Sequence, residues 1–338
     1  MRPLATRAVT EGALMAALTV VLVLAAAYVP ALGFVLTFFL PAPAAAVTVR
    51  HGPAAAFLSV AAAAVLLALF LGPVQALGAV LSFAFLGLAF GFGLRRRWDA
   101  GRTILLGALA VAVTAVLAVL FTRLVFHQDI LALMRDSLDS TVRRLAASRL
   151  PSARATAEML QAMLKQIREQ PLMMIAPAAA AVVAMSAVYY AAMRPLFRRT
   201  GVEAPRLTSF AAWTVPRSVA WAWLGVMGLT LLSLRPEWKW LAPLAQNLSY
   251  AAVAVFTAVG ASVAYFFLRY WGLGVAAAGI LAVYASLTPL GQVVVLLGLW
   301  DVLAGLRARF LDRLPAGHPL RAEIGEAALE RLKGRVPQ

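Results

Sequence analysis

Apolar runs of about 20 residues, the length that crosses a bilayer core about 30 Å thick, follow one another along almost the whole chain. Hydrophobic residues make up 63% of the sequence and charged residues only 13%, which lies outside the range of soluble domains. In lipid, each segment must satisfy its own backbone hydrogen bonds. The sequence therefore predicts an all-α fold, a polytopic bundle of transmembrane helices.

We expect about ten spans, divided by the one long polar run in the interior of the chain. Four regions follow: an N-terminal membrane half of five spans, a polar hairpin, a C-terminal half of about five spans and a tail. Their bounds are residues 1–126, 127–170, 171–306 and 307–338. The last apolar block is interrupted at Thr288, Pro289 and Gly291, so it forms either two short spans or one bent span.

The expected spans are residues 10–29, 31–49, 54–71, 74–94, 103–126, 173–193, 218–234, 241–268 and the block 272–306. Pro30, Pro53 and Pro73 mark joints between them. Pro41 and Pro43 fall inside the second run, where each removes a backbone donor and breaks the helix. Residues 39–44 therefore either line a cavity or form a plain helix end.

The polar run predicts two amphipathic helices that bury their apolar faces against each other, with a turn at Pro151 and Ser152. One stripe contains Ile130, Met134, Leu138, Val142 and Leu145, and the other contains Leu160, Met163, Leu164 and Ile167. Ten crossings with a cytoplasmic N-terminus place most Lys and Arg on the inner side. We therefore expect a bacterial inner-membrane protein with both termini cytoplasmic and the hairpin outside. An apolar stripe of Leu320, Ile324, Ala328 and Leu332 predicts a helix in the tail.

Composition also limits the chemistry. There is no cysteine and there are only three histidines, so we expect no metal site and no cofactor. The net charge of +16 sits in short runs between apolar segments, which is typical of membrane orientation signals, and we expect no nucleic-acid partner. Phosphate-loop, metalloprotease and paired-carboxylate patterns are missing, so we expect no enzyme.

Several short segments resemble the YybS-like family of bacterial polytopic membrane proteins. They are Glu11-Gly-Ala-Leu-Met-Ala-Ala-Leu18, Phe39-Leu-Pro41, Val49-Arg-His-Gly52 and Leu297-Gly-Leu-Trp-Asp301 followed by Arg307. The first half also resembles the substrate-binding S-components of energy-coupling-factor transporters. In that family an Ala-x-x-x-Ala on the first helix packs on a membrane coupling subunit, and Ala13 and Ala17 have this spacing here.

Polar side chains at membrane depth are the candidate site residues, because each is costly there without a partner. Gln246, Asn247 and Tyr250 form the densest polar cluster in any span, and Asp301 lies within the last one. They either contact a small solute or hold helices together. For Asp301 we expect an arginine partner, Arg217 or Arg269. Glu11, just after Thr10, is read as a charge at a helix start.

The Arg-rich loop 194–217 includes Arg198, Arg199 and Arg206, which we expect at the inner leaflet or on a partner. The leading hypothesis is a transport-related, substrate-binding membrane subunit for a small solute. The alternative is a non-transporting scaffold or regulator in envelope physiology that acts through the outer hairpin and this loop.

Overall fold

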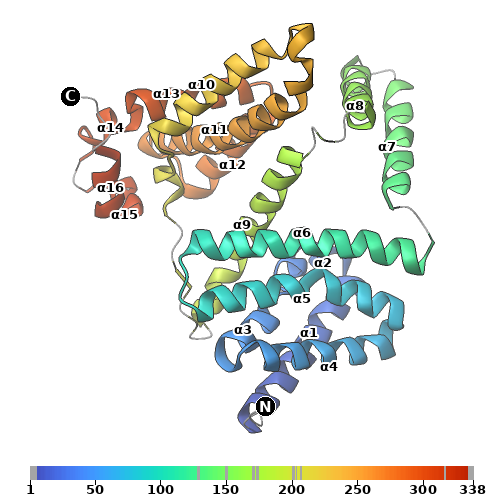
Figure 1. Cartoon of the computed structure of the whole chain (residues 1–338). Coiled ribbons are helices and arrows are strands. Elements are labelled where there is room, and N and C mark those ends of the chain that lie inside the picture. Colours follow the sequence, from blue (N-terminus) through green and yellow to red (C-terminus); the bar gives the residue numbers. More distant parts are fainter. Residues whose placement is uncertain are drawn as a thin grey trace. The chain divides into compact units, whose positions relative to one another are not determined.

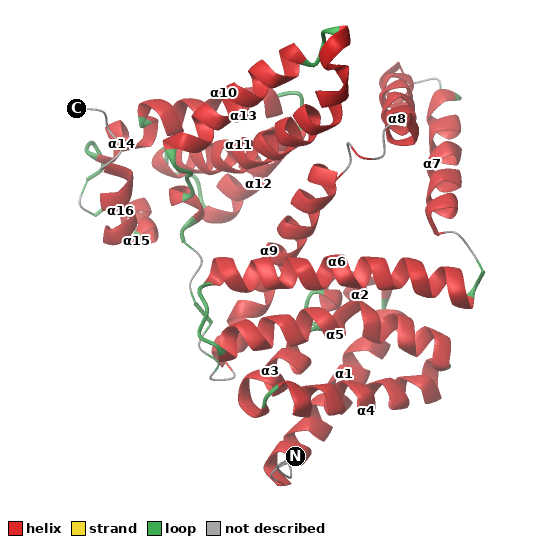
Figure 2. Ribbon diagram, viewed as in Figure 1, coloured by secondary structure: helices red, strands yellow, loops and turns green. Residues whose placement is uncertain are grey.

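A computed structural model describes residues 6–127, 130–148, 151–169, 172, 175–199, 202, 204–205, 208–315 and 317–333. Within these residues the regular structure is helical throughout (Figures 1 and 2), as predicted. The chain packs as two compact units. The first contains residues 1–164 and 181–206, and the second contains residues 165–180 and 207–338. These units are defined by packing, and the four regions defined by polarity stay a prediction.

The first unit begins with six helices. They are α1 (Thr6–Tyr28), α2 (Pro30–Thr37), α3 (Ala42–His51), α4 (Pro53–Leu71), α5 (Pro73–Arg95) and α6 (Ala100–Val125). Pro30, Pro53 and Pro73 each open a helix, and Gly52 and Gly72 reverse the chain with φ of +93° and +85°. Proline suits a first helical position and glycine tolerates positive φ, so these Gly-Pro pairs form the joints predicted from sequence.

Glycines on α5 bring α3 close to it. A Cβ at Gly87 would lie 2.6 Å from the Pro41 carbonyl oxygen, and one at Gly91 would lie 2.7 Å from the Ala45 carbonyl oxygen. Small residues four apart allow this approach in lipid. The predicted break at Pro41 is therefore the packed joint between α2 and α3, with Leu40 and Pro43 buried.

A polar cluster also joins α1 to α3. Glu11 lies inside α1, which already begins at Thr6, and Thr10 does not cap it. The Glu11 carboxylate accepts from Arg7 at 2.9 Å, contacts His51 at 2.8 Å and contacts Arg50 at 3.4 Å. The reading of Glu11 as a helix-start charge was wrong, because basic side chains and not the helix terminus balance its charge.

The hairpin consists of α7 (Ile130–Ala146) and α8 (Pro151–Glu169). Val142, Ala157 and Leu164 are buried together, with Leu138, Leu145 and Leu160 packed against them, so the prediction of mutual burial is confirmed for these residues. The side chains of Ile130, Met134, Met163 and Ile167 lie outside the described part of the structure.

Helix α9 (Ile175–Arg199) starts in the second unit and continues in the first. In the first unit its Ser186 hydroxyl donates to the Ile104 carbonyl oxygen of α6 at 2.7 Å, and Tyr190 contacts the Phe90 ring of α5 edge to face. A Cβ at Gly107 would lie 2.5 Å from the Ser186 hydroxyl oxygen. These contacts hold the later part of α9 against α5 and α6.

The second unit follows. Its elements are the 3-10 helix η2 (Phe210–Ala212), α10 (Arg217–Leu232), η3 (Pro236–Leu241), α11 (Ala242–Tyr270), α12 (Val275–Leu287), α13 (Gly291–Ala304), α14 (Leu306–Leu311), α15 (Pro319–Ile324) and α16 (Glu326–Lys333). Helix α11 is its centre, and α13 crosses α11 where Gly298 meets Gly260, with 2.7 Å between an ideal Gly298 Cβ and the Gly260 nitrogen.

The tail packs onto α11, and its apolar stripe is divided between two short helices, α15 and α16, rather than lying on the one helix predicted, because Gly325 with φ of +80° turns the chain between them. Leu320, Ile324 and Leu332 are buried with Tyr265 and Phe266. Glu323 accepts from the Tyr265 hydroxyl at 2.7 Å and from Arg269 Nε at 3.0 Å.

Seven helical segments of the described chain are long and apolar enough to cross a membrane. Helix α10 is shorter, and α12 and α13 are bent by 108° relative to each other. A count of ten requires that α10, α12 and α13 each cross, so the number of spans is approximate whereas the multi-span helical fold is confirmed.

Candidate ligand pocket and buried polar clusters

Asp301 and Arg307 form a buried ion pair at the junction of α13 and α14. Arg307 Nη2 lies 2.7 Å and Nε lies 3.0 Å from Asp301 Oδ2, and the backbone N–H of Arg307 donates to Oδ1 at 2.8 Å. The Arg307 side chain is fully buried. Gly305, with φ of +64°, ends α13 and turns the chain so that Arg307 faces Asp301.

The prediction of Arg217 or Arg269 as the partner of Asp301 was wrong. Arg269 instead pairs with Glu323 at 3.0 Å. Sequence reasoning looked for an arginine on another span and missed the short reversal at Gly305, which brings a residue six positions later onto the carboxylate.

All five N–H donors of the Arg307 guanidinium are used. Besides Asp301, the group donates to the Ala211 carbonyl at 2.6 Å, the Ser262 hydroxyl at 2.8 Å and the Trp213 carbonyl at 2.8 Å. A guanidinium has five donors and no acceptor, so this cluster is saturated. It joins η2, α11, α13 and α14, and its contacts are structural.

Asn247 joins α11 to the start of α9 within the second unit. Its Oδ1 accepts from the Ala176 backbone N–H at 3.0 Å, and its Nδ2 donates to the Leu172 carbonyl at 2.7 Å and the Pro243 carbonyl at 2.9 Å. The first N–H groups of a helix have no partner inside it, and Asn247 supplies one.

The other candidate residues lie as follows. Tyr250 is partly buried on α11, one turn from the partly buried Gln246, whose Oε1 is buried with no hydrogen-bond partner in the described structure. Substrate contact by Gln246, Asn247, Tyr250 and Asp301 stays a prediction, and the structure gives two of the four, Asn247 and Asp301, well-defined packing roles.

Ala13 and Ala17 are both exposed on α1, whereas Gly12 and Ala16 face the bundle, where Ser59 of α4 donates to the Gly12 carbonyl at 2.7 Å. The Ala-x-x-x-Ala face is therefore largely exposed rather than buried in the bundle. Arg198 is exposed on α9, the Arg199 side chain is not described, and Arg206 lies outside the described residues.

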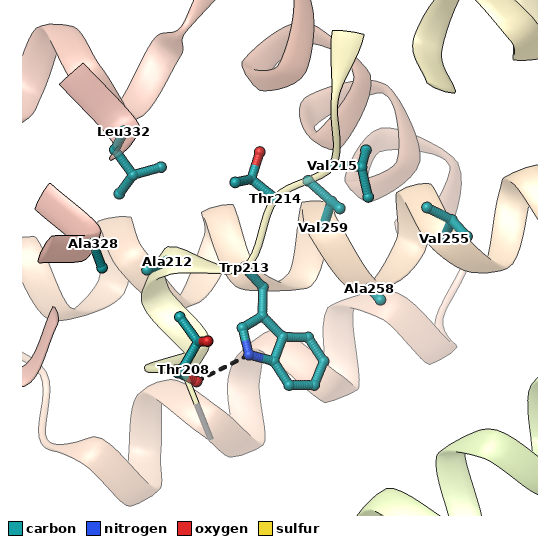
Figure 3. A pocket seen from close by; sticks show the side chains of 10 residues that line it. All are labelled: Thr208, Ala212, Trp213, Thr214, Val215, Val255, Ala258, Val259, Ala328 and Leu332. Carbon is teal, nitrogen blue, oxygen red and sulfur yellow. Dashed lines mark hydrogen bonds between the residues drawn. The ribbon is translucent and has the colours of Figure 1, made fainter. Parts of the chain in front are cut away.

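The second unit contains a pocket of about 510 Å³ (Figure 3). Three parts of the chain line it: the segment around η2, helix α11 and helix α16. It combines a polar edge with an aliphatic wall. The polar edge is Thr208, Trp213 and Thr214, and the remaining lining residues are Ala212, Val215, Val255, Ala258, Val259, Ala328 and Leu332. The Trp213 indole N–H donates to the Thr208 carbonyl at 3.0 Å, which fixes the ring.

Trp213 also belongs to an aromatic cluster with Phe210 and Tyr265. The Arg307 guanidinium holds the backbone at Ala211 and Trp213, so the saturated cluster positions the pocket's polar edge. None of the four predicted solute-contacting residues lines this pocket.

Sequence reasoning missed the pocket residues because it ranked polar side chains inside spans. A signal was present: Pro205 and Pro216 prevent a continuous helix through a stretch containing Thr208 and Thr214. Irregular backbone beside membrane helices is tolerated where it is buried in protein or lines a cavity. No cluster of three or more His, Cys, Asp or Glu that would hold a metal occurs within the described residues.

Long apolar helices, close helix crossings through glycine and saturated buried polar clusters define a polytopic helical membrane protein. Residues 17–302 match the family of predicted membrane proteins called DUF2232, and the chain belongs to this family. It is also 28% identical over 239 residues to "Uncharacterized protein YybS" of Bacillus subtilis (strain 168), which covers 68% of this chain and 74% of that protein. No solved structure matches the chain.

These matches confirm the YybS-like resemblance. Neither match is described as an S-component, so that resemblance rests on the Ala13 and Ala17 spacing and the layout of the first half. The family match contains Asp301 but ends before Arg307, and it also ends before Ala328 and Leu332 of the pocket.

Proposed function

We propose that this chain is a transport-related, substrate-binding membrane subunit, and that the pocket beside Trp213 takes the small solute. The observation that carries the proposal is a cavity of about 510 Å³ with a polar edge and an aliphatic wall. Ligand pockets span roughly 300–1,000 Å³ and combine apolar walls with a few polar groups.

The lining suggests the kind of solute. Trp213 offers an aromatic ring next to Thr208, while Val215, Val255 and Val259 offer aliphatic contacts. We propose a small, planar, largely apolar molecule with one or two polar groups. Binding rather than catalysis is the role we assign to the pocket, since none of the lining residues that the structure describes is titratable.

A thermal-shift assay on purified protein tests this proposal. A panel of vitamins, nucleobases and metal ions should contain at least one solute that raises the melting temperature. The variant Ala258→Trp fills the pocket and should abolish the shift, whereas Ala251→Trp, on an exposed position of the same helix, should keep it. A shift retained in Ala258→Trp would place the solute elsewhere, and no shift with any solute would remove the proposal's main support.

Within the same proposal, the exposed Ala13 and Ala17 of α1 are the surface for a membrane coupling subunit. We also propose an inner-membrane location with both termini cytoplasmic and the hairpin outside, on the charge distribution. Arg198 and the neighbouring Arg199 and Arg206 would then meet anionic headgroups.

A scaffold or regulator is the second candidate function, and the hairpin favours it. Its two helices bury their own apolar stripe at Val142, Ala157 and Leu164 and expose charged residues such as Arg143, Arg144 and Arg154. Among its described residues these arginines outnumber the exposed carboxylates Asp136 and Glu158, and a net basic surface suits an acidic protein partner.

Deletion of residues 128–169 should then abolish co-purification of that partner while membrane insertion is retained. The double variant Arg143→Glu and Arg144→Glu should have the same effect without removing the hairpin. Unchanged co-purification in both would count against the scaffold function.

A further inference from the structure

A second pocket, in the first unit, has a different character. It also measures about 510 Å³ and lies at the end of two expected membrane spans. Its lining residues are Val49 of α3, Leu94 and Arg95 of α5, Arg97 just after α5, and Val202, Ala204 and Pro205 after α9. Two arginines therefore stand beside an apolar wall.

Arg95 is fixed by the last carbonyls of α3. Its Nη1 donates to the Val49 carbonyl at 3.1 Å and the Thr48 carbonyl at 3.4 Å. The guanidinium lies beside Gly52, where a Cβ would be in ordinary van der Waals contact with Nη1 at 3.5 Å. A single guanidinium nitrogen makes these contacts, so the group has further N–H donors to offer a ligand.

Arg97 occupies a backbone position that favours glycine. Its φ is +54°, its N–H donates to the Leu94 carbonyl at 3.0 Å, and the Trp98 N–H donates to the Gly93 carbonyl at 3.0 Å. This pair of bonds is the usual helix ending in which glycine takes the left-handed residue. A strained residue that lines a pocket suggests that its side chain is kept for function.

Among the residues that the structure describes, no acidic side chain lines this pocket. Asp99, two residues after Arg97, accepts from the Arg102 backbone N–H at 2.9 Å and contacts its guanidinium at 3.3 Å. Glu11 is occupied by Arg7, Arg50 and His51. The pocket therefore presents two guanidinium groups to an anion.

The remaining lining residues are apolar and are held in place by the fold. Leu94 is 4% exposed and Val202 is 5% exposed. The Tyr190 hydroxyl donates to the Pro205 carbonyl at 3.0 Å, and the Val202 N–H donates to the Phe197 carbonyl at 2.9 Å. Paired cations beside carbon suit a ligand whose anionic group is attached to an apolar body.

We propose that this pocket binds the phosphate group of an anionic phospholipid, with Arg95 and Arg97 contacting the phosphate and Val49, Leu94 and Val202 contacting the adjoining carbon chain. Guanidinium groups match phosphate oxygens in geometry and charge. Basic pockets between membrane helices are suited to such headgroups. This site lies in a different unit from the proposed solute pocket and does not depend on it.

The test measures binding of short-chain lipids to purified full-length protein in a neutral detergent. Dioctanoyl phosphatidylglycerol should bind more tightly than dioctanoyl phosphatidylcholine, and higher ionic strength should weaken the difference. Arg97→Gly removes the side chain at a position where glycine is favoured, so its melting temperature should not fall. It should bind phosphatidylglycerol about tenfold more weakly. Ala204→Trp, which fills the pocket, should also lose binding.

Arg102→Gln is the matched control, because it removes an exposed arginine of the same region that is already paired with Asp99. It should leave binding unchanged. Equal affinity for the two lipids, full binding by Arg97→Gly, or an equal loss in Arg102→Gln would overturn the proposal. Glycerol 3-phosphate distinguishes the source of the phosphate: displacement of the lipid only at far higher concentration supports a lipid site. Equal potency would overturn the lipid assignment in favour of a soluble phosphate.

Discussion

At the scale of single residues, the buried polar groups of this protein mainly hold its helices together. Every N–H of the Arg307 guanidinium donates a hydrogen bond, to Asp301, Ser262 or the carbonyls of Ala211 and Trp213. A charge this deeply buried is tolerated only with such complete pairing. The sequence indicated that Asp301 needs an arginine but could not identify it, because the partner depends on the left-handed turn at Gly305.

Removing one side of this pair should be costly. Asp301→Ala leaves the fully buried Arg307 without its counterion, and we expect a loss of about 3–5 kcal/mol in the free energy of unfolding. The measurement is unfolding in detergent micelles by titration with a denaturing detergent. Asp136→Ala, which removes an exposed carboxylate on α7, is the control and should change little.

The double variant Asp301→Leu with Arg307→Met separates pairing from burial. Since each single change leaves the other charge unpaired, the loss in the double variant should be smaller than the sum of the two single losses. Additive losses would contradict the assignment of these residues as one coupled unit.

Asn247 also holds two helices together, and it does so with both the Oδ1 acceptor and the Nδ2 donor of its side-chain amide. Asn247→Ala removes the acceptor for the Ala176 N–H and the donor to the Leu172 carbonyl, and we expect a loss of about 1–2 kcal/mol. Asn247→Asp keeps the acceptor but replaces the donor with a carboxylate oxygen that faces the Leu172 and Pro243 carbonyls, so it should lose at least as much as Asn247→Ala. Thermal unfolding of the three proteins measures this, and a smaller loss in Asn247→Asp than in Asn247→Ala would contradict the role of the Nδ2 donor.

At the scale of helices, glycine positions set how closely neighbours approach. A Cβ at Gly260 would collide with the Val294 carbonyl of α13, whereas one at Gly228 of α10 meets nothing within 4 Å. We therefore expect Gly260→Ala to destabilise the protein by about 1–3 kcal/mol through overpacking. Gly228→Ala should be neutral or slightly stabilising, because alanine is the better helix former. Unfolding midpoints in one detergent measure both, and equal midpoints would show that the crossing can relax.

The helices themselves were largely predictable. Apolar length located the spans, Pro30, Pro53 and Pro73 located the joints, and the periodicity of Leu138 and Val142 located the hairpin. The functions of Gly260 and Gly298 were not predictable, since a helix crossing is a property of two segments and a single sequence gives no pairing between them.

At the scale of the whole molecule, both pockets lie where a span gives way to irregular backbone. One involves Thr208 to Val215, and the other involves Val202, Ala204 and Pro205. The sequence predicts that the Arg-rich loop 194–217 lies at the inner leaflet or on a partner. It does not predict the pockets, because amino-acid composition indicates how polar a segment is but not whether the folded segment forms a cavity. The tail stripe at Leu320 and Ile324 was visible in the sequence, whereas its contact with α11 through Glu323 depended on long-range packing.

The membrane topology depends on the bent pair α12 and α13. These helices have 13 and 14 residues, so each reaches about 20 Å, less than a bilayer core of about 30 Å. If both cross, the tail returns to the side of the N-terminus. If the pair makes one bent span, the tail lies on the side of the hairpin. If it enters and leaves on one side, the tail and the N-terminus share a face but Pro289 stays within the membrane.

Single-cysteine labelling distinguishes these cases cleanly, because the natural chain contains no cysteine. We expect Ser140→Cys to react with an impermeant maleimide in intact spheroplasts and Gln338→Cys only after permeabilisation, since the basic tail favours the cytoplasmic side. Pro289→Cys should react from outside if α12 and α13 each cross. Reaction of Ser140→Cys and Gln338→Cys from the same side would contradict an even number of crossings.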